Sequence, residues 1–113
     1  MLSDVIKIKI PSTVSLAKRA GKVVSGESAV KEAIRFKKAF LVIVAQDVSK
    51  NTFKSISDSC SFYNIPLYTL GTKEELGGAI GNNFNAAIAI CDKGLADSIE
   101  KAIKANINGG EAL

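Results

Sequence analysis

Residues 16–34 read LAKRAGKVVSGESAVKEAI, a basic segment followed by the start of an amphipathic helix. Apolar side chains recur at helical spacing from residue 29 to residue 34, which predicts a helix with one apolar face. We predict that Ser25 is the N-cap, because serine is preferred at that position. Gly26 lacks a side chain, so the unpaired N–H groups of the first turn lie open to close approach. This stretch is either an ordinary helix start or a site that binds a negatively charged group.

Helix and strand patterns alternate on both sides of this stretch. A first helix, with Leu16, Ala17 and Ala20 on its apolar face, is predicted to end near Gly21. The near-continuous apolar run FLVIVAQD predicts a strand covered on both faces. The other predicted elements are a strand at Val23–Val24, a helix capped by Ser49, a strand at IPLYTL, a helix opened by a Thr72–Glu75 capping box, a strand at NAAIAIC and a closing helix.

This alternation predicts an α/β protein with helices on both faces of a mixed or largely parallel sheet. At 113 residues the chain has the length of one domain. We place a flexible N-terminal arm at residues 1–11 and the single domain at residues 12–108. The arm contains VIKIKI, which alternates like a strand but has no obvious turn that would return it to the sheet.

Composition excludes several classes of protein. The longest apolar run, AFLVIVA, is far shorter than a membrane span, and the lysines of VIKIKI interrupt any signal peptide. Cys60 and Cys91 have no neighbouring Cys or His at the spacing of metal ligands. We therefore expect a cytoplasmic protein with reduced cysteines and without a metal, a cofactor or a membrane contact.

The net charge of +4 is unevenly distributed along the chain. Residues 1–38 contain nine Lys/Arg and three acids, for a net charge of +6, whereas the remaining residues contain six Lys/Arg and eight acids, for −2. This asymmetry indicates either a face for an anionic partner such as nucleic acid or an ordinary solvated surface.

The sequence contains few groups of residues that could support catalysis. The chain has no histidine, so the commonest general base and every Ser–His or Cys–His pair are missing. Asp47 and the Asp92–Lys93 pair each follow a predicted strand, where an α/β sheet could hold magnesium and a phosphate. Aspartates at such positions more often cap helices or orient loops. A phosphate-handling enzyme therefore remains only as an alternative.

Cations surround the predicted helix start. Lys18, Arg19 and Lys22 precede it, and on the helix Lys31, Arg35 and Lys38 recur at i, i+4 and i+7. With the positive end of the helix dipole, this pattern is typical of a phosphate-binding surface. An ordinary Glu27–Lys31 pair across one turn is the alternative.

Four segments in order resemble one known family. They are LAKRAGKVVSGESAVKEAI, FLVIVAQDVSKNT, FYNIPLYTLGTKEELGGAIG and AIAICDKGLADSI, and the likeness covers residues 12–104. The chain resembles the kink-turn RNA-binding ribosomal-protein family, and most closely its small bacterial YlxQ-like branch.

The resemblance implies a three-layer α-β-α sandwich with a four-stranded mixed sheet and no catalysis. It implies a partner of structured RNA, sharply kinked beside sheared guanine–adenine pairs, and an association with the ribosome; we expect a monomer. Relatives hold such RNA with the helix start at Gly26 and with an apolar loop, here near residues 83–87. The predicted RNA contacts are Lys18, Arg19, Lys22, Ser25, Gly26, Glu27, Ser28, Lys31, Arg35, Phe84, Ala86 and Ala87.

Three positions depart from the family pattern. Ribosomal members typically have Asn or Lys at Ser28, Glu or Gln at Ala29 and Lys at Glu32. Ala29 has no group that reads a base edge, and Glu32 reverses a charge. Two interpretations therefore stay open: binding of kinked RNA, or a protein-interaction module on the same fold.

Overall fold

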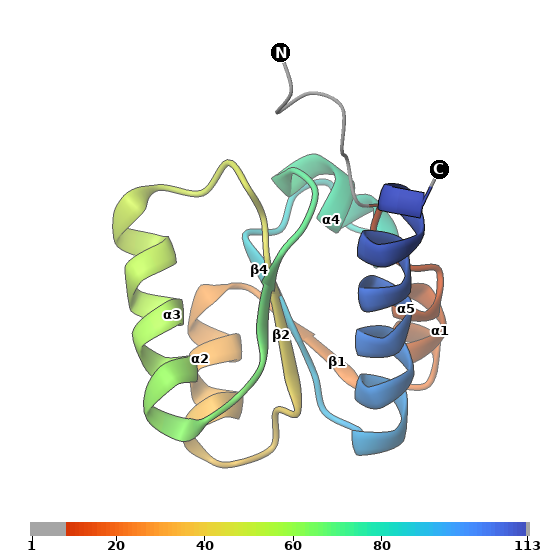
Figure 1. Cartoon of the computed structure of the whole chain (residues 1–113). Helices are drawn as coiled ribbons and strands as arrows, with labels where there is room; N and C mark the ends of the chain where they lie inside the picture. The colour runs from red at the N-terminus through yellow and green to blue at the C-terminus, as the bar shows by residue number, and fades with distance from the viewer. Residues whose placement is uncertain (1–8, 113) are drawn as a thin grey trace.

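A computed structural model describes residues 9–112, with side chains over residues 9–106. The described chain forms a four-stranded sheet with helices on both faces (Figure 1). The elements are α1 (Thr13–Arg19), β1 (Val23–Ser25), α2 (Glu27–Arg35), β2 (Leu41–Val44), α3 (Lys50–Tyr63), β3 (Leu67–Thr69), α4 (Lys73–Ala79), β4 (Ala87–Ile90) and α5 (Lys93–Ala112).

The strand order is β1-β4-β2-β3. β2 and β3 run parallel, because α3 carries the chain back across the sheet between them. β4 runs antiparallel to both β2 and β1, with Val42 opposite Ala89 and Val24 opposite Ala89. The predicted mixed sheet is confirmed.

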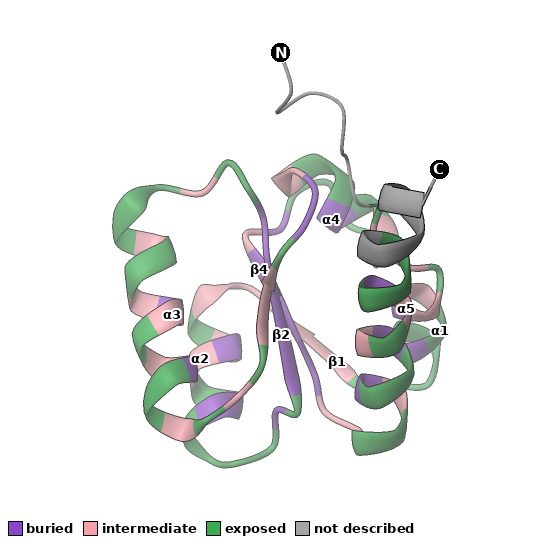
Figure 2. Cartoon of the chain, in the orientation of Figure 1, coloured by how far each residue is buried: buried purple, intermediate pink, exposed green. Residues whose placement is uncertain are grey.

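The two central strands, β2 and β4, are buried on both faces, as the run FLVIVAQD predicted for β2 (Figure 2). Alternate β2 residues enter different cores: Val42 and Val44 pack with α2 and α3, whereas Leu41 and Ile43 pack with α1, α4 and α5. This alternation produces three layers and confirms the α-β-α sandwich.

Local signals locate some helix starts and miss others. Ser49 caps α3, and Thr72 with Glu75 forms the capping box of α4, as predicted. The prediction of Ser25 as the cap of α2 is wrong: Gly26 is the N-cap, and Ser25 is the last residue of β1, opposite Ile88. The continuous antiparallel pairing of β1 with β4 keeps Ser25 in the sheet.

The described elements can be set beside the expected boundaries of the domain, which remain a prediction. In α1 the buried residues are Val14 and Ala17, whereas Leu16 is 47% exposed and Ala20 is also exposed. Of the predicted apolar face, Ala17 is therefore confirmed, and Leu16 and Ala20 are wrong. Ile10 packs against the core that contains α1, although we assigned residues 1–11 to an arm. Residues 1–8 of that arm lie outside the described residues, and α5 continues to Ala112, beyond the predicted end of the domain at residue 108.

Candidate nucleic-acid interface

Gly26 joins β1 directly to α2. Its φ of 93° and ψ of 150° lie in a region that is open almost only to glycine, and a Cβ there would meet nothing within 4 Å. Its N–H donates to the carbonyl oxygen of Ala87 at 2.9 Å, and no side chain caps the helix. The first-turn N–H groups of Glu27, Ser28 and Ala29 therefore point outward from a backbone held against the start of β4.

The loop of residues 82–86 lies beside this helix start. The carbonyl oxygen of Ala86 accepts from the Ala45 N–H at 2.8 Å, and the Asn85 N–H donates to the carbonyl oxygen of Lys73 at 2.9 Å. These two bonds tie the loop to the end of β2 and to the start of α4. Phe84 directly precedes these two residues and is 67% exposed, a large apolar side chain presented to solvent.

α4 supports this loop by close backbone contact at Gly77. A Cβ on Gly77 would lie 2.8 Å from the backbone of Asn83 and Phe84. Glycine is therefore required for the loop to pack against α4 at this distance. Sequence reasoning missed Gly77, although the Gly-Gly pair inside a helix is itself an unfavourable pattern that signals a close approach.

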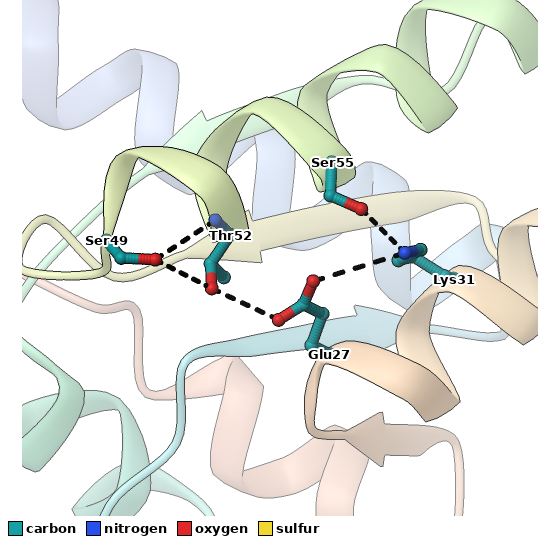
Figure 3. A network of polar contacts seen from close by, with 5 residues as sticks. All are labelled: Glu27, Lys31, Ser49, Thr52 and Ser55. Atoms are coloured by element: carbon teal, nitrogen blue, oxygen red, sulfur yellow. Dashed lines mark hydrogen bonds and ion pairs between the residues drawn. The ribbon is translucent and has the colours of Figure 1, made fainter.

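A polar network joins the start of α2 to the start of α3 (Figure 3). The Thr52 hydroxyl donates to Glu27 Oε1 at 3.1 Å, and Lys31 Nζ donates to Ser55 Oγ at 2.6 Å. Lys31 Nζ also lies 4.0 Å from Glu27 Oε2. The structure therefore forms the Glu27–Lys31 pair but directs both side chains toward α3. Their contact with RNA remains a prediction.

The helices α2, α3 and α4 all begin at the same end of the sheet. Thr52 links α3 to α2, and Asp47 Oδ1 accepts from the Lys73 N–H of α4 at 2.8 Å. Lys50 and Lys73 are the first residues of α3 and α4, which begin at the same end of the sheet as α2, and neither lysine was predicted as a site residue. A cation next to a helix start is unfavourable because it opposes the helix dipole. This unfavourable placement was the sequence feature that could have indicated the two lysines.

The cations predicted around Gly26 lie largely at the other end of the sheet. The carbonyl oxygen of Lys22 accepts from the Cys91 N–H at 2.8 Å, four residues and about 13 Å of strand away from Gly26. Lys18 and Arg19 are in the last turn of α1, just before it. The expectation that these cations flank the helix start is therefore wrong, because β1 separates them from it.

Some of the other residues that we predicted around the start of α2 lie there, and some do not. α2 ends at Arg35, so Lys38 is not on the predicted cationic line of the helix. Ser28 is exposed and Ala86 is half-buried beside the helix start. Ala87 is fully buried and packs into the core with α2 and α3, so its side chain is unavailable to a base.

The Cys91 thiol lies at the basic end of the sheet. Burial raises the pKa of this thiol, and the Lys38 and Lys22 ammonium groups oppose the increase in pKa. This effect places both lysines near one half-buried side chain. Lys38 follows α2 and Lys22 precedes β1, so two separate segments contribute cations here.

The alternative catalytic constellation is not assembled. Asp47 follows β2 and Asp92 follows β4, and because these strands are antiparallel their ends lie at opposite edges of the sheet. Asp92 Oδ2 accepts from the Leu95 N–H at 2.9 Å, while Lys93 Nζ pairs with Asp97 at 3.1 Å. The expectation of one joint site is wrong, and the aspartates instead orient the starts of α4 and α5.

Within the described residues, no set of three or more His, Cys, Asp or Glu side chains gathers where a metal ion would fit. Over the same part of the chain, no helix combines the length and apolar character needed to cross a membrane.

Residues 8–100 match the family model described as the Ribosomal protein L7Ae/L30e/S12e/Gadd45 family. The chain belongs to this family. The match spans α1 to the first part of α5 and includes both Gly26 and the loop at Phe84. The resemblance noted in the sequence is thereby confirmed.

Two bacterial relatives in the L7Ae/L30e/S12e/Gadd45 family are named RNA-binding protein YlxQ. The Bacillus subtilis (strain 168) protein is 39% identical over 84 residues, which cover 74% of this chain and 84% of the relative. The Enterococcus faecium protein is 35% identical over 96 residues, which cover 85% and 92% of the two chains.

Solved structures show the same fold. A protein with unknown function from Bacillus halodurans C superposes with a TM-score of 0.81 at 32% identity, over 87% of this chain and 99% of the other. The Giardia lamblia 15.5kD RNA binding protein has a TM-score of 0.66 at 19% identity, over 89% and 83%. At that identity the second likeness concerns the fold alone.

Proposed function

We propose that this protein binds structured, sharply kinked RNA and catalyses no reaction. It works as a cytoplasmic monomer, without a cofactor, in association with the ribosome. The observation that carries the proposal is the uncapped start of α2 at Gly26, bonded to Ala87 and adjoining the exposed Phe84. Membership of a family whose named relatives are RNA-binding proteins supports the same partner.

The two halves of the interface supply different interactions. The outward N–H groups of Glu27, Ser28 and Ala29 offer donors to guanine edges or to phosphate oxygens. Phe84 offers an apolar surface for a base that the kink turns out of its stack. Lys50 and Lys73 lie at the same edge and neutralise phosphates on either side.

The departures from the family pattern limit how bases are read. Ser28 is exposed and keeps a hydroxyl, while Ala29 is half-buried and apolar. Specificity for kinked RNA then depends on the backbone of α2 and on the shape of the 82–86 loop. Shape is the usual basis on which proteins recognise structured RNA.

A gel-shift series that compares kinked and straight duplex RNA of equal length tests this function. We expect tighter binding of the kinked RNA, with an affinity that falls as salt rises by a log–log slope of about 0.7–0.9 per neutralised phosphate. Phe84→Ala should remove most of the preference for kinked RNA. Phe62→Ala is the matched control, because Phe62 is 78% exposed on α3, outside this interface.

Equal binding of the two RNAs, or no binding of either, would contradict the proposal. The second result would favour the protein-interaction module. Its supporting observation is that several aromatic side chains, Phe36, Phe62 and Phe84 among them, are more than half exposed. Such side chains are enriched where proteins bind one another.

A further inference from the structure

The turn after α2 combines cations with exposed aromatic rings. Residues 35–40 read RFKKAF, here named the RFKKAF turn. Phe36 is 57% exposed and Phe40 is 41% exposed. The Phe40 N–H donates to the carbonyl oxygen of Ile90 at 2.9 Å, which fixes the turn at the end of β4 that lies away from Gly26. It therefore belongs to the basic end of the sheet.

Two features of the RFKKAF turn are unusual for a segment that only connects a helix to a strand. The Arg35 guanidinium lies 5.1 Å from the centre of the Phe36 ring, so a cation and a ring surface are presented together. Lys37 has a φ of 61°, a conformation that glycine or asparagine adopts at lower cost after a helix. The exposed Lys37 side chain does not pack into the core, which leaves the choice of lysine without a structural reason.

The RFKKAF turn separates two surface hollows. Phe36 and Lys38 line a hollow of about 210 Å³ with Val24 and Ala29. Lys37 and Phe40 line a second hollow of about 570 Å³ with Tyr63 and Pro66. Each hollow therefore has an aromatic wall and a lysine.

Acidic groups at these hollows are mostly engaged. In the larger hollow Asp97 pairs with Lys93 at 3.1 Å. Glu100 accepts from the Tyr68 hydroxyl at 2.7 Å, and its charge is offset by Lys104 Nζ at 3.8 Å. Glu32 lines the smaller hollow together with Lys38. With Arg35, Lys37, Lys38 and the adjoining Lys22, cations outnumber the remaining acid, so the surface suits a polyanion.

We propose that the RFKKAF turn, together with Lys22, is a second RNA site that takes an unpaired strand. Exposed rings among cations are the features with which proteins hold single strands: bases stack on the rings, and lysines neutralise phosphates. The proposal rests on RNA binding at Gly26. The nine residues of α2 separate the two sites by about 14 Å, so an unpaired segment leaving a kinked RNA reaches the turn.

The test compares one kinked RNA with and without an unpaired tail of about ten nucleotides, within the range of single-strand site sizes. Wild-type protein should bind the tailed RNA roughly 5- to 150-fold more tightly, the range given by stacking of one base. Phe36→Ala should abolish this gain while leaving the affinity for untailed RNA unchanged. Phe62→Ala, at the more exposed ring on α3, should keep the gain.

Lys37→Gly separates RNA contact from a structural role. Glycine relieves the positive φ, so the urea midpoint should rise or stay constant while the gain from the tail falls. Lys54→Ala is the matched control, because it also removes one positive charge, at an exposed lysine of α3 that pairs with Asp58 at 2.9 Å and lines neither hollow. This variant should keep the gain.

Three results would overturn the second site. They are equal affinity of wild-type protein for tailed and untailed RNA, a gain that survives both turn variants, and a gain that is lost equally in both control variants. Failure of the proposed function is distinguishable, because it appears as absent binding of untailed kinked RNA. The isolated tail, titrated alone against wild type and Phe36→Ala, then still decides whether the turn binds single strands.

Discussion

Gly26 combines a conformational requirement with open space, so its replacement separates strain from contact. Gly26→Ala should lower the free energy of unfolding by about 1–2 kcal/mol, because an L-residue is strained at a φ of 93° although nothing would touch its Cβ. The same methyl group lies where RNA would approach the first turn of α2. We therefore expect a loss of kinked-RNA binding in the variant that remains folded, measured by gel shift beside urea unfolding.

Gly21→Ala is the matched control for this change. Gly21 has a φ of 74° and also has nothing within 4 Å of a Cβ, but it lies at the other end of β1. Its replacement should cost similar stability and leave the binding of untailed kinked RNA intact. Equal losses of binding in the two variants would mean that strain alone, rather than contact at Gly26, weakens the complex.

Single residues were predicted well where the chemistry is local. The serine and threonine caps of α3 and α4 follow from side chains that bond their own helices. Ser25 was assigned wrongly, because its place in the sheet depends on pairing with β4, which is distant in sequence. Gly26 was identified as the open position, but its positive φ is set by that same distant strand.

At the scale of elements, α4 and the 82–86 loop form one unit through Gly77. Gly77→Ala should lower the free energy of unfolding by about 1–3 kcal/mol, because its Cβ would lie 2.8 Å from loop backbone that must move. Displacement of Phe84 should also weaken the binding of kinked RNA. Thermal unfolding and gel shifts of the same samples measure both effects.

The neighbouring Gly78 provides the contrast. A Cβ on Gly78 meets nothing within 4 Å, so Gly78→Ala should raise the free energy of unfolding by about 0.5–1 kcal/mol through the better helix propensity of alanine. RNA binding should not change. Similar effects of both alanines would show that the loop does not depend on close packing against α4.

β3 and α5 are joined by Tyr68, whose hydroxyl donates to Glu100 at 2.7 Å. Burial, followed by the bond to Glu100 and its charge, raises the pKa of Tyr68 from 10.0 to about 12. Between these values the unfolded chain loses the phenolic proton while the native protein keeps it. The free energy of unfolding should therefore fall as pH rises through this window, and be independent of this group below pH 10.

Urea unfolding across this alkaline window measures the effect. Tyr68→Phe should make the fall in stability shallower without removing it, because burial also raises the pKa of Cys60 from 9.0 to about 11. Glu100→Gln should lower the pKa of Tyr68 only part of the way, since burial is its largest cause. A pH profile that is unchanged in Tyr68→Phe would exclude the tyrosine as its source.

The types of the elements were readable from the sequence, but their neighbours in space were not. Continuous apolar runs predicted the two central strands, because burial on both faces leaves no polar alternation. The apolar face of α1 was partly misjudged, since a helix of seven residues has too few turns to define its buried side. The supporting contact at Gly77 depends on the folded loop and has only the Gly-Gly pair as a signal.

For the whole molecule, the decisive feature is that the sheet has two chemically different ends. One end gathers the starts of α2, α3 and α4, and the other gathers Lys22, Lys38 and the RFKKAF turn. The sequence predicted the excess of cations in residues 1–38 but placed them around Gly26. Strand direction decides their location, and the antiparallel pairing of β1 with β4 could not be read from spacing alone.

Glu32 lies between these two ends. It is six residues past Gly26, about 9 Å along α2, and lines the hollow that contains Phe36 and Lys38. Kinked RNA docked at the helix start comes close to this carboxylate, whereas only an unpaired tail continues to the turn. Glu32→Lys should therefore tighten the binding of kinked RNA by about 1 kcal/mol and steepen the salt dependence by about 0.7–0.9.

The increase in net positive charge would by itself strengthen RNA binding. The comparison therefore needs a variant with the same charge change at another position. Asp58→Lys alters the charge equally at an exposed position of α3, where Asp58 pairs with Lys54 at 2.9 Å. We expect Asp58→Lys to help straight and kinked RNA alike, and Glu32→Lys to raise the ratio of kinked to straight affinity at two salt concentrations. If both variants change that ratio equally, the RNA does not follow α2, and the two ends of the sheet act on separate partners.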